Sequence, residues 1–200
     1  MDSRLYWIWL QQALPLGSLH PDPLLRAFGD ARGVYDADAD AIDRLQIVGL
    51  DSEPLLDKSL DTARRIFDRA LKNGDWLLTP EDALYPSLLR VMPDLPLVLY
   101  GRGEMPDLDR LPSITIVGTR ETTNYGRQAT ALLAGSLAKG GMVIVSGGAR
   151  GVDAIAHDAA LQAGGQTIAV QGCGLDIEYP AENTELRRRI ARSGAEIGRA

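Results

Sequence analysis

The sequence has few of the residue types that mark several classes of protein. Its 200 residues include one cysteine, two histidines and two phenylalanines. The single cysteine, Cys173, cannot form an intramolecular disulfide, which excludes a small scaffold held together by disulfides and agrees with a reducing compartment. We therefore predict a cytoplasmic location.

Long hydrophobic runs are also absent. No stretch approaches the roughly 18 consecutive apolar residues that a membrane-spanning helix requires. Near the N-terminus, Asp2, Arg4 and Gln11 interrupt the apolar patches, and no small-residue cleavage site follows them. We predict neither a signal peptide nor a membrane span. The 45% hydrophobic and 24% charged content is typical of a globular chain with one sizeable core or two small ones.

Basic residues are scarce in the first half of the chain. Residues 1–112 hold 12 Lys and Arg against 19 Asp and Glu, whereas residues 113–200 hold 9 against 8. The net charge of −6 therefore belongs to the first half. It does not argue against nucleic acid as a ligand of the second half, where a local basic edge can attract phosphate.

The first 74 residues show short apolar patterns at helical spacing, separated by turns. We predict a small helical domain over residues 1–74, with Tyr6, Trp7 and Trp9 in its core rather than exposed for base stacking. The aspartates between residues 36 and 43 lack the glycine and the closing glutamate of a calcium loop. We therefore predict a solvated acidic face there and no metal site.

From residue 75 the pattern changes to short Val- and Ile-rich runs that alternate with segments of helical length. The predicted strands are 114–117, 142–145 and 167–170, and the predicted helices are 125–139, 154–163 and 182–191. Such alternation is typical of a parallel sheet covered on both faces, with right-handed crossovers. We predict an α/β fold with a mostly parallel sheet over residues 75–200. Strand 167–170 has one obvious neighbour, so we expect its other edge to be bare.

Each of the three predicted strands ends in a polar loop that contains glycine, at residues 118–120, 146–153 and 172–174. In an open parallel sheet, ligands bind beyond the carboxyl ends of the strands, where helix N-termini present free N–H groups. One such turn alone is as often a structural connection as a site. Three loops that converge on one edge favour a ligand.

The chemistry of these loops favours a phosphate-rich ligand. Glycines allow close approach of the backbone, Thr119 and Ser146 add hydroxyl donors, and Arg120 and Arg150 add charged, bidentate donors. Residues 147–151 match neither the dinucleotide fingerprint nor the P-loop. The loops therefore disfavour NAD or a nucleoside triphosphate, and we predict no cofactor.

Several segments closely resemble the DNA-processing protein A family, DprA/Smf. They are residues 116–120, 125–127, 146–157, 164–170 and 179–183. The resemblance covers residues 76–190, and the helical start, which is similar to a SAM or helix-hairpin-helix domain, also looks like the family's N-terminal region. It implies an extended Rossmann-like domain that binds single-stranded DNA, protects it, and helps to load the RecA recombinase in natural transformation. It implies neither a cofactor nor turnover.

The resemblance also implies which residues bind DNA, because the family's pocket is formed by the loops described above. The implied DNA-binding residues are Gly118, Thr119, Arg120, Ser146, Gly147, Gly148, Arg150, Gly151 and Asn183. Thr119 stands where the family has serine, and Gly148 where it has a larger apolar residue; neither change removes a donor. The family's domain continues through further strands, so we expect a truncated member that lacks part of the family's homodimer surface.

Two enzymatic alternatives agree less well with the sequence than binding does. Asp153 and His157 share a helix face, and Cys173 follows a strand, but such a pair more often caps its helix and a lone thiol is usually inert. A nucleotide phosphoribohydrolase of related fold would need a proline-glycine-glycine-x-glycine-threonine loop, which is absent. A protein-interaction adaptor that uses the acidic helical domain is a third possibility. We predict a DNA-binding protein with no catalytic residues.

Overall fold

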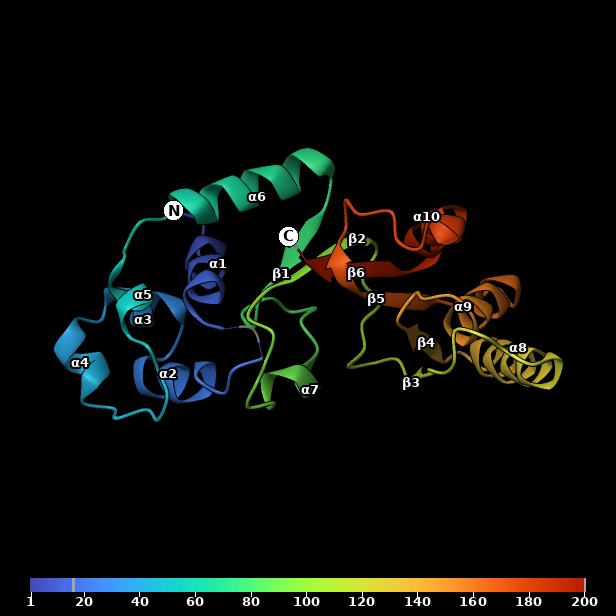
Figure 1. Ribbon diagram of the computed structural model, residues 1–200, viewed down its shortest axis with the longest axis horizontal. Helices are drawn as coiled ribbons and strands as arrows, with labels where there is room; N and C mark the ends of the chain where they lie inside the picture. The colour runs from blue at the N-terminus through green and yellow to red at the C-terminus, as the bar shows by residue number, and fades with distance from the viewer. Residues whose placement is uncertain (16, 200) are drawn as a thin grey trace. The chain divides into compact units, whose positions relative to one another are not determined.

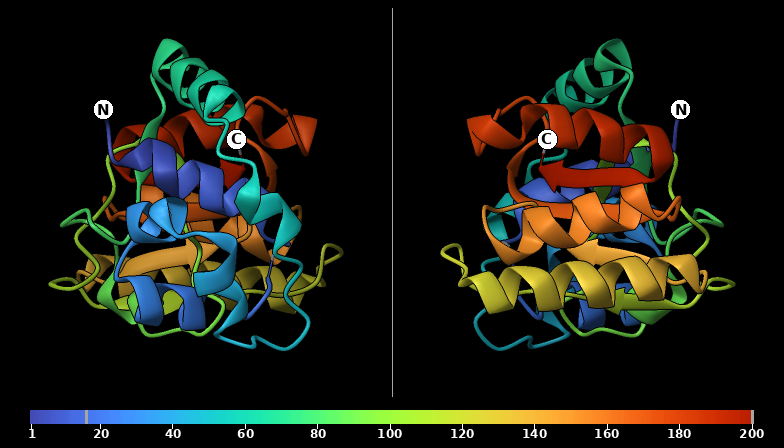
Figure 2. Two further views of the ribbon diagram at one scale, coloured as in Figure 1. Left: turned by 90° about the vertical axis from the view of Figure 1, so that its left-hand side faces the viewer. Right: turned by 90° about the vertical axis from the view of Figure 1, so that its right-hand side faces the viewer.

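The computed structural model describes residues 1–15 and 17–199 (Figures 1 and 2). The chain forms two compact units, one of residues 1–73 and 77–99 and the other of residues 74–76 and 100–200. The division into domains 1–74 and 75–200 stays a prediction. Within the described residues, no helix is both long and apolar enough to cross a membrane.

The first unit consists mainly of short helices. They are α1 (Arg4–Ala13), α2 (Pro21–Phe28), α3 (Ala31–Asp36), α4 (Ala39–Asp43), α5 (Glu53–Leu56), α6 (Asp61–Asn73) and α7 (Ser87–Arg90). Trp7 and Trp9 are buried, as predicted, and the Trp9 indole donates to the Asp57 carbonyl at 2.7 Å. Tyr6 packs edge-to-face on Tyr35 with ring centroids 4.9 Å apart. The aromatic residues of α1 therefore stabilise the core of this unit.

A mixed sheet confirms the α/β prediction. Its strands are β1 (Trp76–Leu78), β2 (Leu99–Gly103), β3 (Ser113–Thr115), β4 (Val143–Ser146), β5 (Thr167–Gly174) and β6 (Ala195–Arg199). Their order is β1-β2-β6-β5-β4-β3. Strands β3 to β6 pair in parallel, and β2 pairs antiparallel with β6.

Three helices connect the parallel strands: α8 (Asn124–Lys139), α9 (Val152–Gln162) and α10 (Thr184–Ser193). Each crossover steps to the next strand in the same direction, so right-handed connections place all three helices on one face of the sheet. Figures 1 and 2 show α8, α9 and α10 side by side on that face. These helices thus cover one face, not both as we had expected.

The expectation of a bare edge beside strand 167–170 is wrong. Strand β6 pairs along it, with Ile168 opposite Ala195 and Val170 opposite Ile197. The sequence concealed β6 because a glutamate and a glycine interrupt its apolar residues. Glu196 is nevertheless buried, because Arg187 of α10 forms an ion pair with it. Beyond β6 the sheet continues through β2 to β1, so among the described strands β1 rather than β5 ends this side of the sheet.

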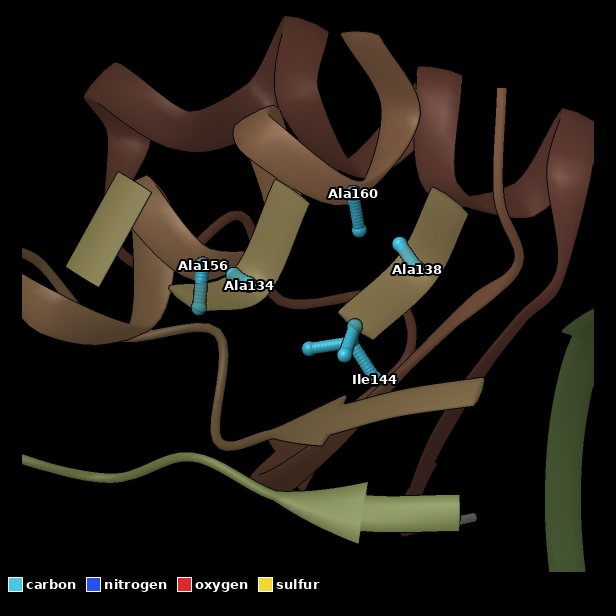
Figure 3. Close-up of a cluster of buried hydrophobic side chains, with 5 residues drawn as sticks. All are labelled: Ala134, Ala138, Ile144, Ala156 and Ala160. Atoms are coloured by element: carbon cyan, nitrogen blue, oxygen red, sulfur yellow. The ribbon is translucent and has the colours of Figure 1, made fainter. Parts of the chain in front are cut away.

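Small side chains form the layer between the sheet and the helices (Figure 3). The buried cluster comprises Ala134 and Ala138 of α8, Ile144 of β4, and Ala156 and Ala160 of α9. Alanines let α8 and α9 approach one another closely, and Ile144, which is fully buried, contributes about 1.5–3 kcal/mol through its burial. This layer packs α8 and α9 against one another and against β4, and the loops of the candidate site directly precede the two helices.

Candidate nucleic-acid interface

The loop after β3 and the loop after β4 are packed directly against one another. The Val152 amide donates to the Thr119 carbonyl at 3.1 Å. Gly151 has a φ of +81°, and a Cβ there would collide with the Thr119 carbonyl and the Arg120 backbone. Only glycine fits, because the left-handed conformation and the close approach both exclude a side chain. The second glycine loop and the start of α9 are therefore fixed to the first.

A third segment holds the loop after β4 from the other side. The Asn183 side-chain amide donates to the Gly148 carbonyl at 3.1 Å and to the Ala149 carbonyl at 3.2 Å. The Asp153 carboxylate accepts from the Ala149 amide at 3.3 Å, and it would lie 2.8 Å from a Cβ at Gly147. The side chains of Asn183 and Asp153 thus set the conformation of the loop. They contact Gly148 and Ala149 from one side and leave the opposite side, which we call the front, open.

The front of this loop faces a cavity of about 240 Å³, which we call the glycine-loop pocket. It lies at the carboxyl ends of β4 and β5, where the parallel-sheet rule places ligands. Its lining residues are Arg120, Gly147, Gly148, Ala149, Gln171, Gly172, Cys173, Tyr179 and Pro180. Three of the predicted DNA-binding residues, Arg120, Gly147 and Gly148, line the pocket.

The pocket presents hydrogen-bond donors that have no partner. The backbone amides of Gly147 and Gly148 donate to no other residue that the structure describes. Gly148 has a φ of +73°, a conformation in which successive amides form an anion-binding concavity. Arg120 is exposed and forms no ion pair with any residue in the described ranges. Free amides beside a free guanidinium favour a phosphate oxygen as ligand.

The other predicted residues stand around the pocket rather than in its lining. Ser146 is buried, and its hydroxyl donates to the Ile116 carbonyl at 2.6 Å. The Thr119 hydroxyl bonds locally to the backbone of Glu121. Arg150 is paired with Glu182 at 3.3 Å on the surface. In this structure Gly118, Ser146, Gly151 and Asn183 contact the backbone or side chains of neighbouring segments and position the loops, and the contacts of all these residues with DNA stay a prediction.

Sequence reasoning did not assign Gln171, Tyr179 or Pro180 to the site. Tyr179 is 49% exposed at the pocket, where its ring can stack on a base. Gln171 is buried in the wall; it accepts from the Cys173 thiol at 3.5 Å and donates to Glu196 at 3.2 Å. The Tyr-Pro pair was visible as part of the family resemblance, but Gln171 lies within strand β5 and had no signal.

The pair Asp153 and His157 lies outside the lining of the pocket. His157 is fully buried, and its Nδ1 is 2.7 Å from the Thr167 hydroxyl. Because that hydroxyl donates its hydrogen to the Ile144 carbonyl, it accepts from Nδ1–H, and Nε2 carries no proton. Burial lowers the pKa of His157 to about 4. The histidine is a neutral component of the core and does not face the pocket.

Residues 76–199 match the model of the DNA recombination-mediator protein A family. The chain belongs to this family. Among curated proteins, Protein Smf of Synechocystis sp. is 44% identical over 96% of this chain and 50% of its own length. The DNA processing protein DprA of Bacillus subtilis is 41% identical over 54% of this chain and 36% of its own length. This chain thus spans half or less of the length of these two relatives.

Two solved structures are similar to this one. The X-ray structure of DNA processing protein A from Streptococcus pneumoniae is 28% identical, with a TM-score of 0.69 over 96% of this chain and 66% of that chain. A structure that addresses the single-stranded DNA binding mode of DNA processing protein A from Helicobacter pylori is 40% identical, with a TM-score of 0.54 over 61% of this chain and 54% of that chain.

Proposed function

We propose that this chain binds the backbone of single-stranded DNA at the glycine-loop pocket and has no catalytic activity. The observation that carries the proposal is the placement of the free Gly147 and Gly148 amides beside the unpaired Arg120 at the carboxyl ends of parallel strands. Membership of the family supports it, as does the similarity to the Helicobacter pylori protein studied for its single-stranded DNA binding.

The shape of the pocket supports single strands over duplex. A duplex is read by an element that enters a groove, whereas this site is a concave edge lined by backbone amides. The exposed ring of Tyr179 offers a stacking surface that an unpaired base can reach. Backbone contacts combined with stacking bind DNA without regard to sequence.

We further propose the biological setting that the family resemblance implies. The bound strand is incoming DNA in natural transformation, which the protein protects in the cytoplasm and on which it helps to load a RecA-type recombinase. The proposed DNA-binding residues remain those named from the sequence, with Arg120, Gly147 and Gly148 as the direct contacts. The homodimer that the resemblance implies for full-length members is not part of the proposal for this chain.

Fluorescence anisotropy with labelled single- and double-stranded oligonucleotides across a salt series tests the binding. We expect tighter binding of single strands, with an affinity that falls with salt by a logarithmic slope of about 0.7 for each neutralised phosphate. Equal affinity for duplex, or binding that does not respond to salt, contradicts the proposal. A mixture with a RecA-type recombinase and a single strand coated by a single-strand-binding protein then tests loading.

A further inference from the structure

A second, larger cavity lies beside α10, away from the glycine-loop pocket. Its volume is about 340 Å³, and guanidinium groups from β2 and α10 converge on it. We call it the arginine cavity; its arginines are Arg102, Arg187, Arg188 and Arg192. None of them belongs to the predicted DNA-binding set.

A buried ion pair forms one wall of the arginine cavity. Arg187 and Glu196 are paired at 2.7 Å, with side chains 8% and 3% exposed. Arg187 also donates to the carbonyls of Leu175 and Ile177. With its carboxylate partner and two carbonyl acceptors, Arg187 is satisfied and presents a neutral, rigid wall. Any attraction for a ligand must therefore come from the other three arginines.

Those three arginines retain donors for a ligand. Arg102 is oriented by Asp75, which accepts from its Nε at 2.8 Å, and by the Leu175 carbonyl, 3.4 Å from Nη1; its Nη2 has no partner among the described residues. Arg192 forms no ion pair in the part of the chain that the structure describes. Arg188 has only an exposed pair with Glu185 at 3.3 Å, which is worth little.

Two exposed acidic residues, Asp176 and Glu178, also line the cavity. Because the buried pair cancels, three arginines remain against three carboxylates, those of Asp176, Glu178 and the Asp75 that holds Arg102, and Glu185 pairs with Arg188, so the cavity has no net positive charge. The carboxylates weaken attraction for an anion, so this cavity is suited to assist a ligand held elsewhere rather than to capture a free anion by itself.

The arginine cavity and the glycine-loop pocket share a wall. Residues 172–180 line both: Cys173, Tyr179 and Pro180 face one, and Leu175 and Glu178 face the other. A hydrogen-bond network also joins them, because Glu196 accepts from Gln171 in the wall of the pocket and from Arg187 in the wall of the cavity. The two cavities are therefore adjacent and separated by residues 174–178.

We propose that the arginine cavity is a second subsite for single-stranded DNA, which takes backbone phosphates next to those held in the glycine-loop pocket. The inference rests on the proposed function. Arg102, whose position is set by Asp75, contacts one phosphate directly, and the guanidinium groups of Arg188 and Arg192 contact phosphates beside it. The cavity lengthens the binding site, so its contribution depends on the length of the oligonucleotide.

The test compares oligothymidylates of about 6 and about 20 nucleotides by fluorescence anisotropy, since subsites of this kind cover several nucleotides each. The test variant is Arg188→Ala/Arg192→Ala, and the matched control is Arg189→Ala, which lies on the same helix but pairs with Asp158 outside the cavity. We expect the double variant to bind the short oligonucleotide like the parent and the long one about threefold to tenfold more weakly, with a salt slope lower by about 0.7 for each phosphate lost.

A second variant tests the same subsite through an expected gain, rather than a loss, of binding affinity. Glu178→Gln removes an exposed carboxylate from the cavity and should strengthen binding of the long oligonucleotide while leaving the short one unchanged. If the parent binds the long oligonucleotide and the double variant matches it at every salt concentration, the second subsite is refuted while the proposed function stands. If the parent binds neither oligonucleotide, the proposed function and the subsite fail together.

Discussion

The glycine-loop pocket and the arginine cavity share residues 172–180 but are built in opposite ways. The pocket offers backbone amides, and its shape depends on positions where a Cβ has no room. The cavity offers guanidinium groups around a buried ion pair, and most of its lining comes from helix α10 and strands β2 and β6. We therefore expect the pocket to respond to changes in loop conformation and the cavity to changes in charge.

The largest effect should come from breaking the buried pair of the arginine cavity. Arg187→Met leaves Glu196 as an uncompensated buried carboxylate, which should cost about 3–5 kcal/mol of unfolding free energy, measured by urea denaturation. The control is Arg187→Met/Glu196→Met, which removes both charges and should recover most of the stability. A double variant as unstable as the single one would show that the packing of the arginine, rather than its charge, is what matters.

The backbone of the glycine-loop pocket should be almost as sensitive. Gly151→Ala combines a positive φ with a collision against the Thr119 carbonyl, so we expect the free energy of unfolding to fall by about 3 kcal/mol or more. We also expect this variant to lose oligonucleotide binding. Gly164→Ala has a φ of +74° but open space, and should cost about 1 kcal/mol. Gly172→Ala has neither constraint and should leave stability unchanged. Equal urea midpoints for all three variants would contradict this ranking.

Acid should destabilise the fold around α9, the helix that follows the second glycine loop and contains His157. The folded state holds His157 neutral down to about pH 4, whereas the unfolded chain takes up a proton from about pH 6.5 downward. The contribution of His157 is therefore fully present above about pH 6.5 and is lost as the pH falls toward 4, by up to about 3 kcal/mol. Urea unfolding at several pH values measures how steeply the free energy of unfolding falls with pH, and His157→Phe should reduce this slope. An unchanged slope in that variant would assign the acid sensitivity to other groups.

The smallest effect separates two arginines that look equivalent in the sequence. Arg120 lines the pocket without an ion pair among the described residues, and Arg120→Ala should weaken oligonucleotide binding by about 1–3 kcal/mol for all sequences alike. Arg150 lies outside the lining and is paired with Glu182, so Arg150→Ala should cost under about 1 kcal/mol. Anisotropy measures both, and an equal loss in the two variants would place the strand over both loops.

Much of the sheet was predictable because periodic apolar runs report burial directly. The strand after residue 142 and helices α8 and α9 were placed to within a few residues. Strand β6 was not, because Glu196 is buried only by virtue of Arg187, nine residues earlier. From the sequence alone, a charged residue that is buried with a tertiary partner cannot be distinguished from a charged residue on the surface. The arginine cavity was hidden in the sequence for a related reason, because its arginines come from β2 and α10, which lie far apart in the chain.

By itself, the sequence determined the α/β class, the loops that follow β3 and β4, and the glycines that those loops require. These features are local, because strand periodicity and left-handed turns are properties of short segments. Only the tertiary structure decided which donors are free: it turned Ser146 toward Ile116 and Asn183 toward the loop, and left Arg120 open. It also joined the two cavities through Gln171 and Glu196. Whether a polar group is satisfied depends on partners far away in the chain, and short-range patterns carry no record of them.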